Sequence, residues 1–295
     1  MTGFPVVPTL ILRALVDGVL LGLFYSVIAL GLALIFGVMN IINFAHGDFV
    51  MLAAYITWLV ARALYLNEAA PVAIVTVPVF FAIGIAFYRL IIKPLLGGDP
   101  LIQIACTVGV GFILQNVALI LFKAEPRSLP GLLLGTYIAL GPVSVHLAKL
   151  VAGAVSAVLI VLIHRMLTGT WLGLAIRATA YSEEVAKTFG INTDRVFMLV
   201  TGIGIALTGF GGVLWMSFGQ VDPYLGASFA LVSWIIVALG GLGGIRGLIY
   251  ASLLVGVIEA LTMTYISPSV AKAIPFVIFI VATWLRPQGL FTGRG

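Results

Sequence analysis

The chain has 295 residues, of which 62% are hydrophobic and only 8% are charged, and its formal net charge is +5. Soluble domains carry about a quarter charged residues, so this composition excludes an ordinary water-soluble protein and predicts an all-α, polytopic integral membrane protein. Cys106 is the only cysteine, which excludes an intrachain disulfide scaffold, and the scattered Lys and Arg residues argue against nucleic-acid binding.

Long uncharged runs indicate the membrane spans, because a helix needs about 20 apolar residues to cross a bilayer. In chain order the runs are 18–44, 49–61, 71–88, 101–122, 150–163, 197–218, 226–242, 248–266 and 274–285. The count is nine if every run crosses, or eight if Asn40–Asp48 or the turn at Gly240–Gly247 bends back. We therefore predict one transmembrane domain over residues 1–295 with eight or nine helices.

The connections between nine spans carry unequal numbers of Lys and Arg on the two sides. One side has nine: Arg89, Lys93, Arg165, Arg177, Lys187, Arg195, Arg246, Arg286 and Arg294. The other side has six: Arg13, Arg62, Lys123, Arg127, Lys149 and Lys272. Because cytoplasmic connections are enriched in Lys and Arg, the first side is predicted to be cytoplasmic, with the amino terminus outside.

Polar residues gather at the end of the first run, at Asn40, Asn43, His46 and Gly47. If the helix continues through this stretch, Asn40, Asn43 and Gly47 share one face and His46 lies at its margin. Amide and imidazole groups are costly in hydrocarbon unless they meet partners or water. They are therefore expected either to cap a helix end or to line a solute path, with Gly47 allowing close backbone approach.

The stretch at about 168–195 is the longest with soluble character. Ser182 is placed to cap a short helix, Glu183 and Glu184 would occupy its first turn, and Gly190 would end it. Its apolar stripe would consist of Val185, Ala186 and Phe189. Physical reasoning leaves two possibilities open: the stripe rests on the membrane or on the protein's own helices, or it contacts a partner.

Glu259 is a carboxylate inside the eighth apolar run. An ionised carboxylate is expensive in hydrocarbon, so this side chain should face the bundle interior, be paired, or be protonated. A hydrogen bond between helices and a role in a solute path are both open.

Motifs for catalysis or cofactor binding are absent from the sequence. The three His residues and Cys106 lie in four separate segments, so no metal site is predicted. The chain lacks a G-x-x-x-x-G-K-[ST] loop and a nucleophile–base pair, so it is predicted not to be an enzyme and to bind no ATP itself. The Ala-Leu-Gly patterns in 29–37 and 238–247 are attributed to glycine frequency rather than to an internal repeat.

Four blocks of the chain resemble LivH-type permeases, the membrane subunits of branched-chain amino acid ABC importers. They are Ala29–Tyr55 (ALGLALIFGVMNIINFAHGDFVMLAAY), Gly173–Asn192 (GLAIRATAYSEEVAKTFGIN), Gly240–Glu259 (GGLGGIRGLIYASLLVGVIE) and Leu285–Phe291 (LRPQGLF). The blocks occur in the family's order, and the resemblance spans essentially the whole chain.

The resemblance implies a heterodimer with a second, related permease in the cell (inner) membrane. Two cytoplasmic ATP-binding subunits would hold the ATP, and an extracytoplasmic solute-binding protein would deliver the solute. It also implies that the short helix is a cytoplasmic coupling helix. In the importer consensus E-A-A-x3-G, Glu184, Ala186 and Gly190 match and Val185 replaces Ala, whereas the downstream Ile-x-Leu-Pro is absent. Phe189 would insert into a groove on the ATPase.

The expected function is translocation of Leu, Ile and Val, or of related small amino acids, across the membrane. Close relatives in this family carry urea or short amides, which is the first alternative. A stand-alone channel or secondary transporter is the competing class, and it would need an ion or proton site inside the spans. Glu259 is the one candidate carboxylate well inside a predicted span.

Overall fold

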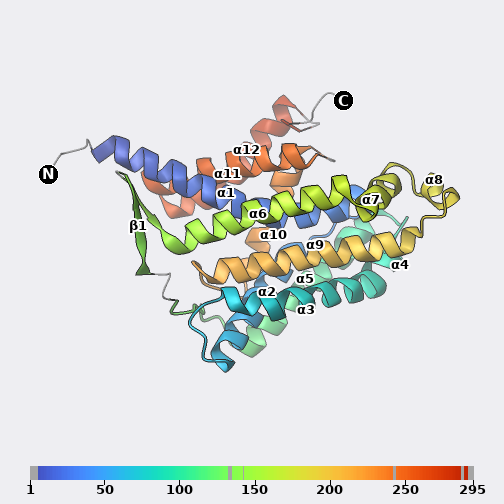
Figure 1. Ribbon diagram of the computed structural model, residues 1–295, viewed down its shortest axis with the longest axis horizontal. Helices are drawn as coiled ribbons and strands as arrows, with labels where there is room; N and C mark the ends of the chain where they lie inside the picture. Colours follow the sequence, from blue (N-terminus) through green and yellow to red (C-terminus); the bar gives the residue numbers. More distant parts are fainter. Residues whose placement is uncertain (1–5, 132–134, 142, 242–243, 287–288, 292–295) are drawn as a thin grey trace.

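The computed structural model describes residues 6–131, 135–141, 143–241, 244–286 and 289–291, and it is almost entirely helical (Figure 1). The first helices are α1 (Val6–Met39), α2 (His46–Ala63), η1 (Ala70–Val72), α3 (Ala73–Phe87), η2 (Tyr88–Ile92), α4 (Lys93–Leu95) and α5 (Pro100–Phe122). The later helices are α6 (Leu147–Gly169), α7 (Trp171–Tyr181), α8 (Glu183–Thr188), α9 (Thr193–Met216), α10 (Leu225–Gly240), α11 (Ile245–Tyr265) and α12 (Pro268–Leu285).

A small antiparallel hairpin is the only exception to the predicted all-α fold within the described residues. It pairs β1 (Tyr137–Leu140) with β2 (Val143–His146), and it lies at the end of the bundle opposite α8 (Figure 1). Strands of four residues are too short to show a clear alternation of apolar and polar positions, so no pattern in the sequence predicted them.

Seven helical segments of the described chain are long and apolar enough to cross a membrane. They are Thr9–Met39, Ala70–Leu95, Pro100–Phe122, Leu147–Gly169, Thr193–Met216, Ile245–Tyr265 and Pro268–Leu285. α10 has only 16 residues, and α2 carries His46, Asp48 and Arg62, so neither is among the seven. The prediction of a multi-pass membrane protein is confirmed, but the count of eight or nine depends on α2 and α10. The predicted turn at Gly240–Gly247 lies partly outside the described residues, and Arg294 lies outside them.

α1 and α9 form the centre of the bundle. Of their most apolar stretches, 67% and 72% are buried, against 17% for α5 and for α12. The two central helices run antiparallel and approach closely at Gly31 and Gly204, where a Cβ atom on either residue would overlap the carbonyl oxygen of the other. Small residues allow such close approach in a membrane, where helix association depends on packing.

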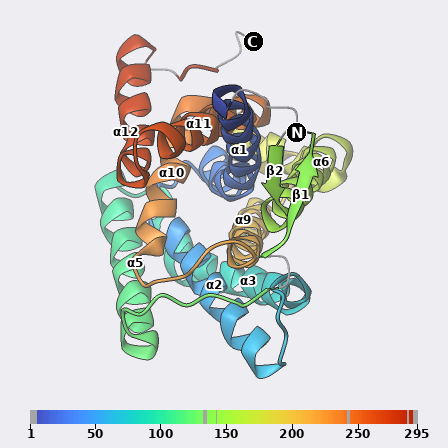
Figure 2. The same ribbon diagram turned by 90° about the vertical axis from the view of Figure 1, so that its left-hand side faces the viewer.

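The outer helices surround this pair in an inverted arrangement. α11 packs antiparallel along α1, with Gly256 against Gly22, and α3 packs antiparallel along α9, with Gly84 against Gly202. α2 and α10 cross each other between them. The series α1, α2, α3, α5 therefore recurs as α9, α10, α11, α12 with every helix reversed, and α5 and α12 lie on the same side of the molecule (Figure 2).

This internal repeat corrects the interpretation of the sequence, which predicted none. The similarity between 29–37 and 238–247 was attributed to glycine frequency. Segment 29–37 lies in α1, and the described part of 238–247 lies at the end of α10 and the start of α11, so the two segments are not equivalent in the repeat. Inverted repeats are a known architecture of membrane transporters, with the functional region where the repeats meet.

Candidate functional site

The polar stretch after the first run breaks the helix instead of extending it. α1 ends at Met39, and Asn40 adopts a left-handed backbone conformation with φ +52° while its N–H donates to Phe36 O at 2.8 Å. Asparagine tolerates this conformation better than most residues, which explains why the helix ends there. Asn40, Asn43 and Gly47 therefore do not share one face of a continuous helix, and α2 starts afresh at His46.

Asn43 and His46 are fully buried beside this break, with no exposed surface. His46 Nε2 lies 2.9 Å from Ile28 O of α1 and 3.1 Å from Thr208 Oγ1 of α9, so it joins three helices. The Asn43 side chain has no hydrogen-bond partner among the described residues, whereas the backbone carbonyl of Asn43 accepts from Trp234 Nε1 of α10 at 3.2 Å.

Side chains of α5 form hydrogen bonds with backbone groups of the extended segment between α1 and α2. The Phe44 N–H donates to Thr107 Oγ1 at 3.2 Å, and Thr107 Oγ1 donates to Ile42 O at 3.1 Å. The Ile42 N–H points to Gln103 Oε1 at 3.5 Å. A broken helix inside a membrane needs such partners, because unpaired backbone groups cost several kcal/mol in hydrocarbon.

The starts of α2 and α10 cross inside the bundle at Gly47 and Gly226. A Cβ atom on Gly47 would overlap the backbone of Gly226 and Ala230, so only glycine fits there. A Cβ atom on Gly226 would overlap the carboxylate of Asp48, and one on Gly111 of α5 would also meet it. The expectation of close backbone approach at Gly47 is thus confirmed.

Asp48 is the residue of this region that sequence reasoning missed. It is only 8% exposed, and it lies at the first turn of α2, where the partial positive charge of the helix favours a carboxylate. It is the only acidic residue of α2, and that is the signal in the sequence that could have identified it.

Glu259 lies apart from these residues, between α11 and α1. Its carboxylate oxygens accept a hydrogen bond from the Tyr25 hydroxyl at 3.1 and 3.2 Å. Of the two expectations for Glu259, the hydrogen bond between helices is the one that the structure shows.

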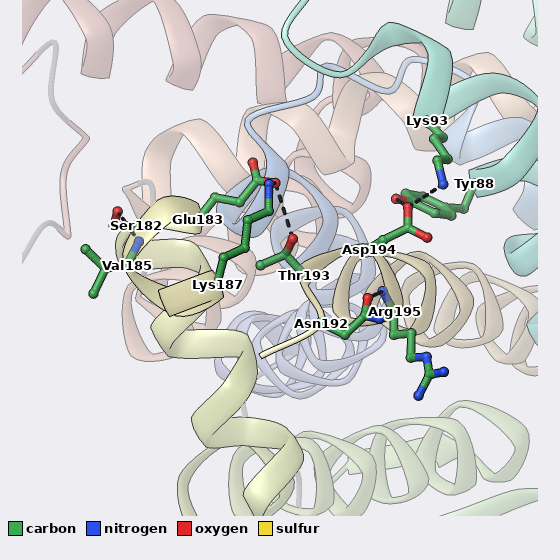
Figure 3. Close-up of polar contacts among 10 residues, drawn as sticks. All are labelled: Tyr88, Lys93, Ser182, Glu183, Val185, Lys187, Asn192, Thr193, Asp194 and Arg195. Atoms are coloured by element: carbon green, nitrogen blue, oxygen red, sulfur yellow. Dashed lines mark hydrogen bonds and ion pairs between the residues drawn. The ribbon is translucent and has the colours of Figure 1, made fainter. Parts of the chain in front are cut away.

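The predicted short helix is present as α8 at one end of the bundle (Figures 1 and 3). Ser182 Oγ accepts from the Val185 N–H at 3.3 Å, which confirms Ser182 as the N-cap. Gly190 has φ +79°, a conformation that side chains disfavour, so it ends the helix as predicted.

The sequence suggested that the apolar residues of α8 form a stripe that faces one way, but in the structure they do not share one environment. Ala186 is 1% exposed and packs inward, whereas Val185 is 48% and Phe189 is 81% exposed. Glu184 is also exposed. Ala186 therefore packs against the chain itself, as one possibility required, whereas Phe189 is not covered by any part of the described structure, and a contact between Phe189 and a partner stays a prediction.

A network of polar contacts fastens α8 to its neighbours (Figure 3). Glu183 pairs with Lys187 at 2.7 Å and accepts from Thr193 Oγ1 of α9 at 3.3 Å. Asp194, one residue further, pairs with Lys93 at 2.7 Å and accepts from the Tyr88 hydroxyl at 2.8 Å. These contacts join α8 to the start of α9 and, through Asp194, join α9 to the segment at the end of α3.

The predicted site residues thus fall into three places. Glu184, Ala186, Phe189 and Gly190 lie together at the α8 end. Asn40, Asn43, His46 and Gly47 surround the break and the crossing, and Glu259 lies separately on the α1–α11 contact.

Comparison with known proteins gives a consistent result. The family described as "Branched-chain amino acid transport system / permease component" matches residues 14–283. The LivH permease protein of Salmonella typhimurium is 28% identical over 95% of this chain and 94% of its own length, and LivH of Escherichia coli K12 has the same values. BraD of Pseudomonas aeruginosa is 27% identical over 95% of each chain. Both are called high-affinity branched-chain amino acid transport system permease proteins. No solved structure matches the chain.

Proposed function

This chain belongs to the family of permease components of branched-chain amino acid transport systems, and on that premise we propose that it forms one half of the solute path of an ABC importer. The multi-pass helical bundle supplies the path and performs no bond chemistry. Energy comes from two cytoplasmic ATP-binding subunits, which hold the ATP, and an extracytoplasmic solute-binding protein delivers the solute.

α8 is the coupling helix in this proposal. The observation that carries it is an exposed Phe189 at the C-cap of a short helix that Ala186 anchors inward. A large apolar side chain exposed at a polar end of a protein favours a docking contact. Glu184 lies beside it, and the polar contacts of Glu183 would pass the motion to α9.

The α8 end is cytoplasmic in this proposal. Of the nine Lys and Arg residues that the sequence assigned to the cytoplasmic side, all except Arg294 lie in or beside helix termini at the α8 end of the bundle. If α2 and α10 each cross the membrane together with the irregular segment that precedes them, they add two crossings to the seven spans. The chain would then cross nine times, and the amino terminus would lie outside.

The second permease covers the side formed by α5 and α12. These two helices are equivalent in the inverted repeat, lie on the same side and are the least buried of the seven spans (Figure 2). A heterodimer joined there would place the solute path between the two chains. Within this chain the 40–45 segment, which is hydrogen-bonded to α5, would lie behind that path.

The path residues proposed from the sequence have different positions relative to this side. Asn40 is exposed, and the buried amide of Asn43 has no partner in the part of the chain that the structure describes, so both are the best placed to contact solute when the helices move. His46 and Gly47 would set the shape of the path through the helix crossing. Glu259 would act indirectly, through its contact with Tyr25.

Branched-chain amino acids are the proposed solute, since LivH and BraD are named as branched-chain amino acid permeases and this chain matches them over nearly their full lengths. A shorter match, the nucleoside ABC transporter permease NupB of Lactococcus lactis, is 27% identical over 43% of this chain. Solute class therefore differs among the relatives, and measuring what the cognate solute-binding protein binds would decide between Leu, Ile and Val and a urea or amide solute.

Replacement of Phe189 tests the coupling proposal. Phe189→Ala should leave the permease folded and inserted, because the side chain is 81% exposed, but it should weaken ATPase association and reduce uptake by about tenfold or more. Tyr65→Ala is the matched control, since Tyr65 is also a largely exposed aromatic residue and lies at the other end. ATP-driven uptake into proteoliposomes and co-purification of the ATPase are the readouts. Full uptake by Phe189→Ala would remove α8 from the coupling role.

A further inference from the structure

A cavity of about 890 Å³ opens at the α8 end of the bundle, apart from the helix crossing and from α8 itself. The second half of α1 forms its floor, the end of α6 and α7 form one wall, and the end of α10 with the start of α11 forms the other. A volume of this size matches that of small-molecule sites, which range from about 300 to 1,000 Å³.

The cavity has an apolar interior and a cationic rim. Leu34, Ile176 and Leu248 are among the side chains that line the interior. Arg177 of α7 and Arg246 of α11 line the two walls, both are exposed, and no ion pair involves either of them among the residues that the structure describes. None of the described residues that line the cavity is acidic.

We propose that this cavity binds an anionic phospholipid of the leaflet at the α8 end. The phosphodiester would sit between Arg177 and Arg246, whose guanidinium groups match phosphate oxygens in charge and geometry. Part of one acyl chain would fill the apolar interior over α1. Basic pockets between transmembrane helices on the cytoplasmic side are suited to such headgroups.

The position of the cavity gives the lipid a structural role. α7 forms one wall and leads directly into α8, while the opposite wall belongs to α10 and α11. A lipid bridging Arg177 and Arg246 would hold these walls at a fixed separation, and so would favour one arrangement of the coupling segment. The inference rests on the placement of the chain in a bilayer, and it does not depend on which solute is carried.

Lipid retention by the purified full complex tests the proposal. The complex is exchanged into mild detergent with equal amounts of phosphatidylglycerol and phosphatidylcholine, and bound lipid is counted by native mass spectrometry. Two Arg contacts should favour phosphatidylglycerol by roughly tenfold to thirtyfold. The double variant Arg177→Gln/Arg246→Gln should lose this preference, whereas Arg177→Lys/Arg246→Lys should keep part of it.

Arg165→Gln is the matched control, because Arg165 is exposed on the same end of α6 but does not line the cavity. It should retain the lipid like the unaltered chain, and the thermal stability of each variant confirms that it is folded. Equal retention of the two lipids, an unchanged preference in the double variant, the same loss in Arg165→Gln, or displacement of the lipid by inorganic phosphate would each overturn the proposal. None of these readouts depends on transport, so they are independent of the proposed function.

Discussion

Single residues at the helix crossing show how little space the centre of this bundle contains. Asp48 is buried where α2 meets α10, and its carboxylate occupies space that a Cβ atom on Gly226 or on Gly111 would need. The side chain is tolerated inside the bundle because it lies at the positive end of α2. The Asp48 carboxylate can therefore be accommodated only if both positions are glycine.

Gly226→Ala tests this packing. The added methyl group would overlap Asp48, so the free energy of unfolding should fall by about 1–3 kcal/mol, as in other overpacked cores. Gly37→Ala in α1 is the control, since beyond its own stretch of helix no atom of the described residues lies within 4 Å of its added Cβ, and it should be neutral or stabilising by up to about 1 kcal/mol. Thermal unfolding in detergent measures both, and equal stability of the two variants would contradict the packing argument.

The Tyr25–Glu259 contact makes a second prediction for single residues. Tyr25→Phe removes the hydrogen-bond donor to a partly buried carboxylate, which should cost about 1–3 kcal/mol of stability. Glu259→Gln keeps an acceptor and should cost less than Glu259→Leu, which leaves the Tyr25 hydroxyl unpaired. The same unfolding measurement applies. If Gln and Leu have equal, full stability and activity, the contact contributes nothing.

At the scale of elements, α8 depends on its surroundings. It has six residues, and helices this short are not stable alone in water. The Ser182 cap, the inward Ala186 and the Glu183–Thr193 hydrogen bond hold it in place. These contacts join α8 to α9, as the proposed coupling role requires.

A double-mutant cycle on Lys93 and Asp194 measures how strongly the start of α9 is fastened to α4. The two side chains are 53% and 52% exposed, so water weakens their attraction, and the coupling free energy between Lys93→Met and Asp194→Asn should be about 0.2–1 kcal/mol. Chemical unfolding of the four proteins gives this value. A coupling above that range would mean that the pair is shielded from water in the native protein.

At the scale of the whole molecule, the inverted repeat explains the path of the chain. The two central helices α1 and α9 run in opposite directions, and each is followed by an irregular segment and a shorter helix, α2 or α10, that begins inside the bundle. Helix starts inside a membrane present unpaired N–H groups. The crossing is therefore the region where polar groups concentrate in an otherwise apolar protein.

Cysteine accessibility tests the orientation of the molecule. In a Cys106→Ser background, Tyr65→Cys should react with a membrane-impermeant maleimide in intact cells, because Tyr65 is exposed at the end opposite α8. Trp171→Cys, exposed at the start of α7, should react only in inverted vesicles stripped of ATPase. Labelling in the opposite pattern would reverse the sidedness assigned from the charges.

Much of this protein could be predicted from the sequence. Each of the seven spans overlaps a predicted apolar run, since length and hydropathy define what a bilayer accepts, although the first span starts at Thr9 instead of at 18 and the second ends at Leu95 instead of at 88. Ser182 and Gly190 were identified as the ends of α8, because capping and left-handed backbone are local properties. The resemblance to LivH-type permeases rested on blocks that span the chain, and the family match confirms it.

Only the tertiary structure decided which residues face one another. Lipid is as apolar as a protein core, so a run of apolar residues does not indicate which side of a helix is buried, and neither the partners of α1 and α9 nor the inverted repeat could be derived. The inward position of Ala186, the burial of Asp48 against Gly226 and the pairing of the backbone that follows Asn40 all depend on contacts between segments distant in sequence. Such contacts are decided by the close packing of small residues across helices, which becomes visible only when the whole bundle is assembled.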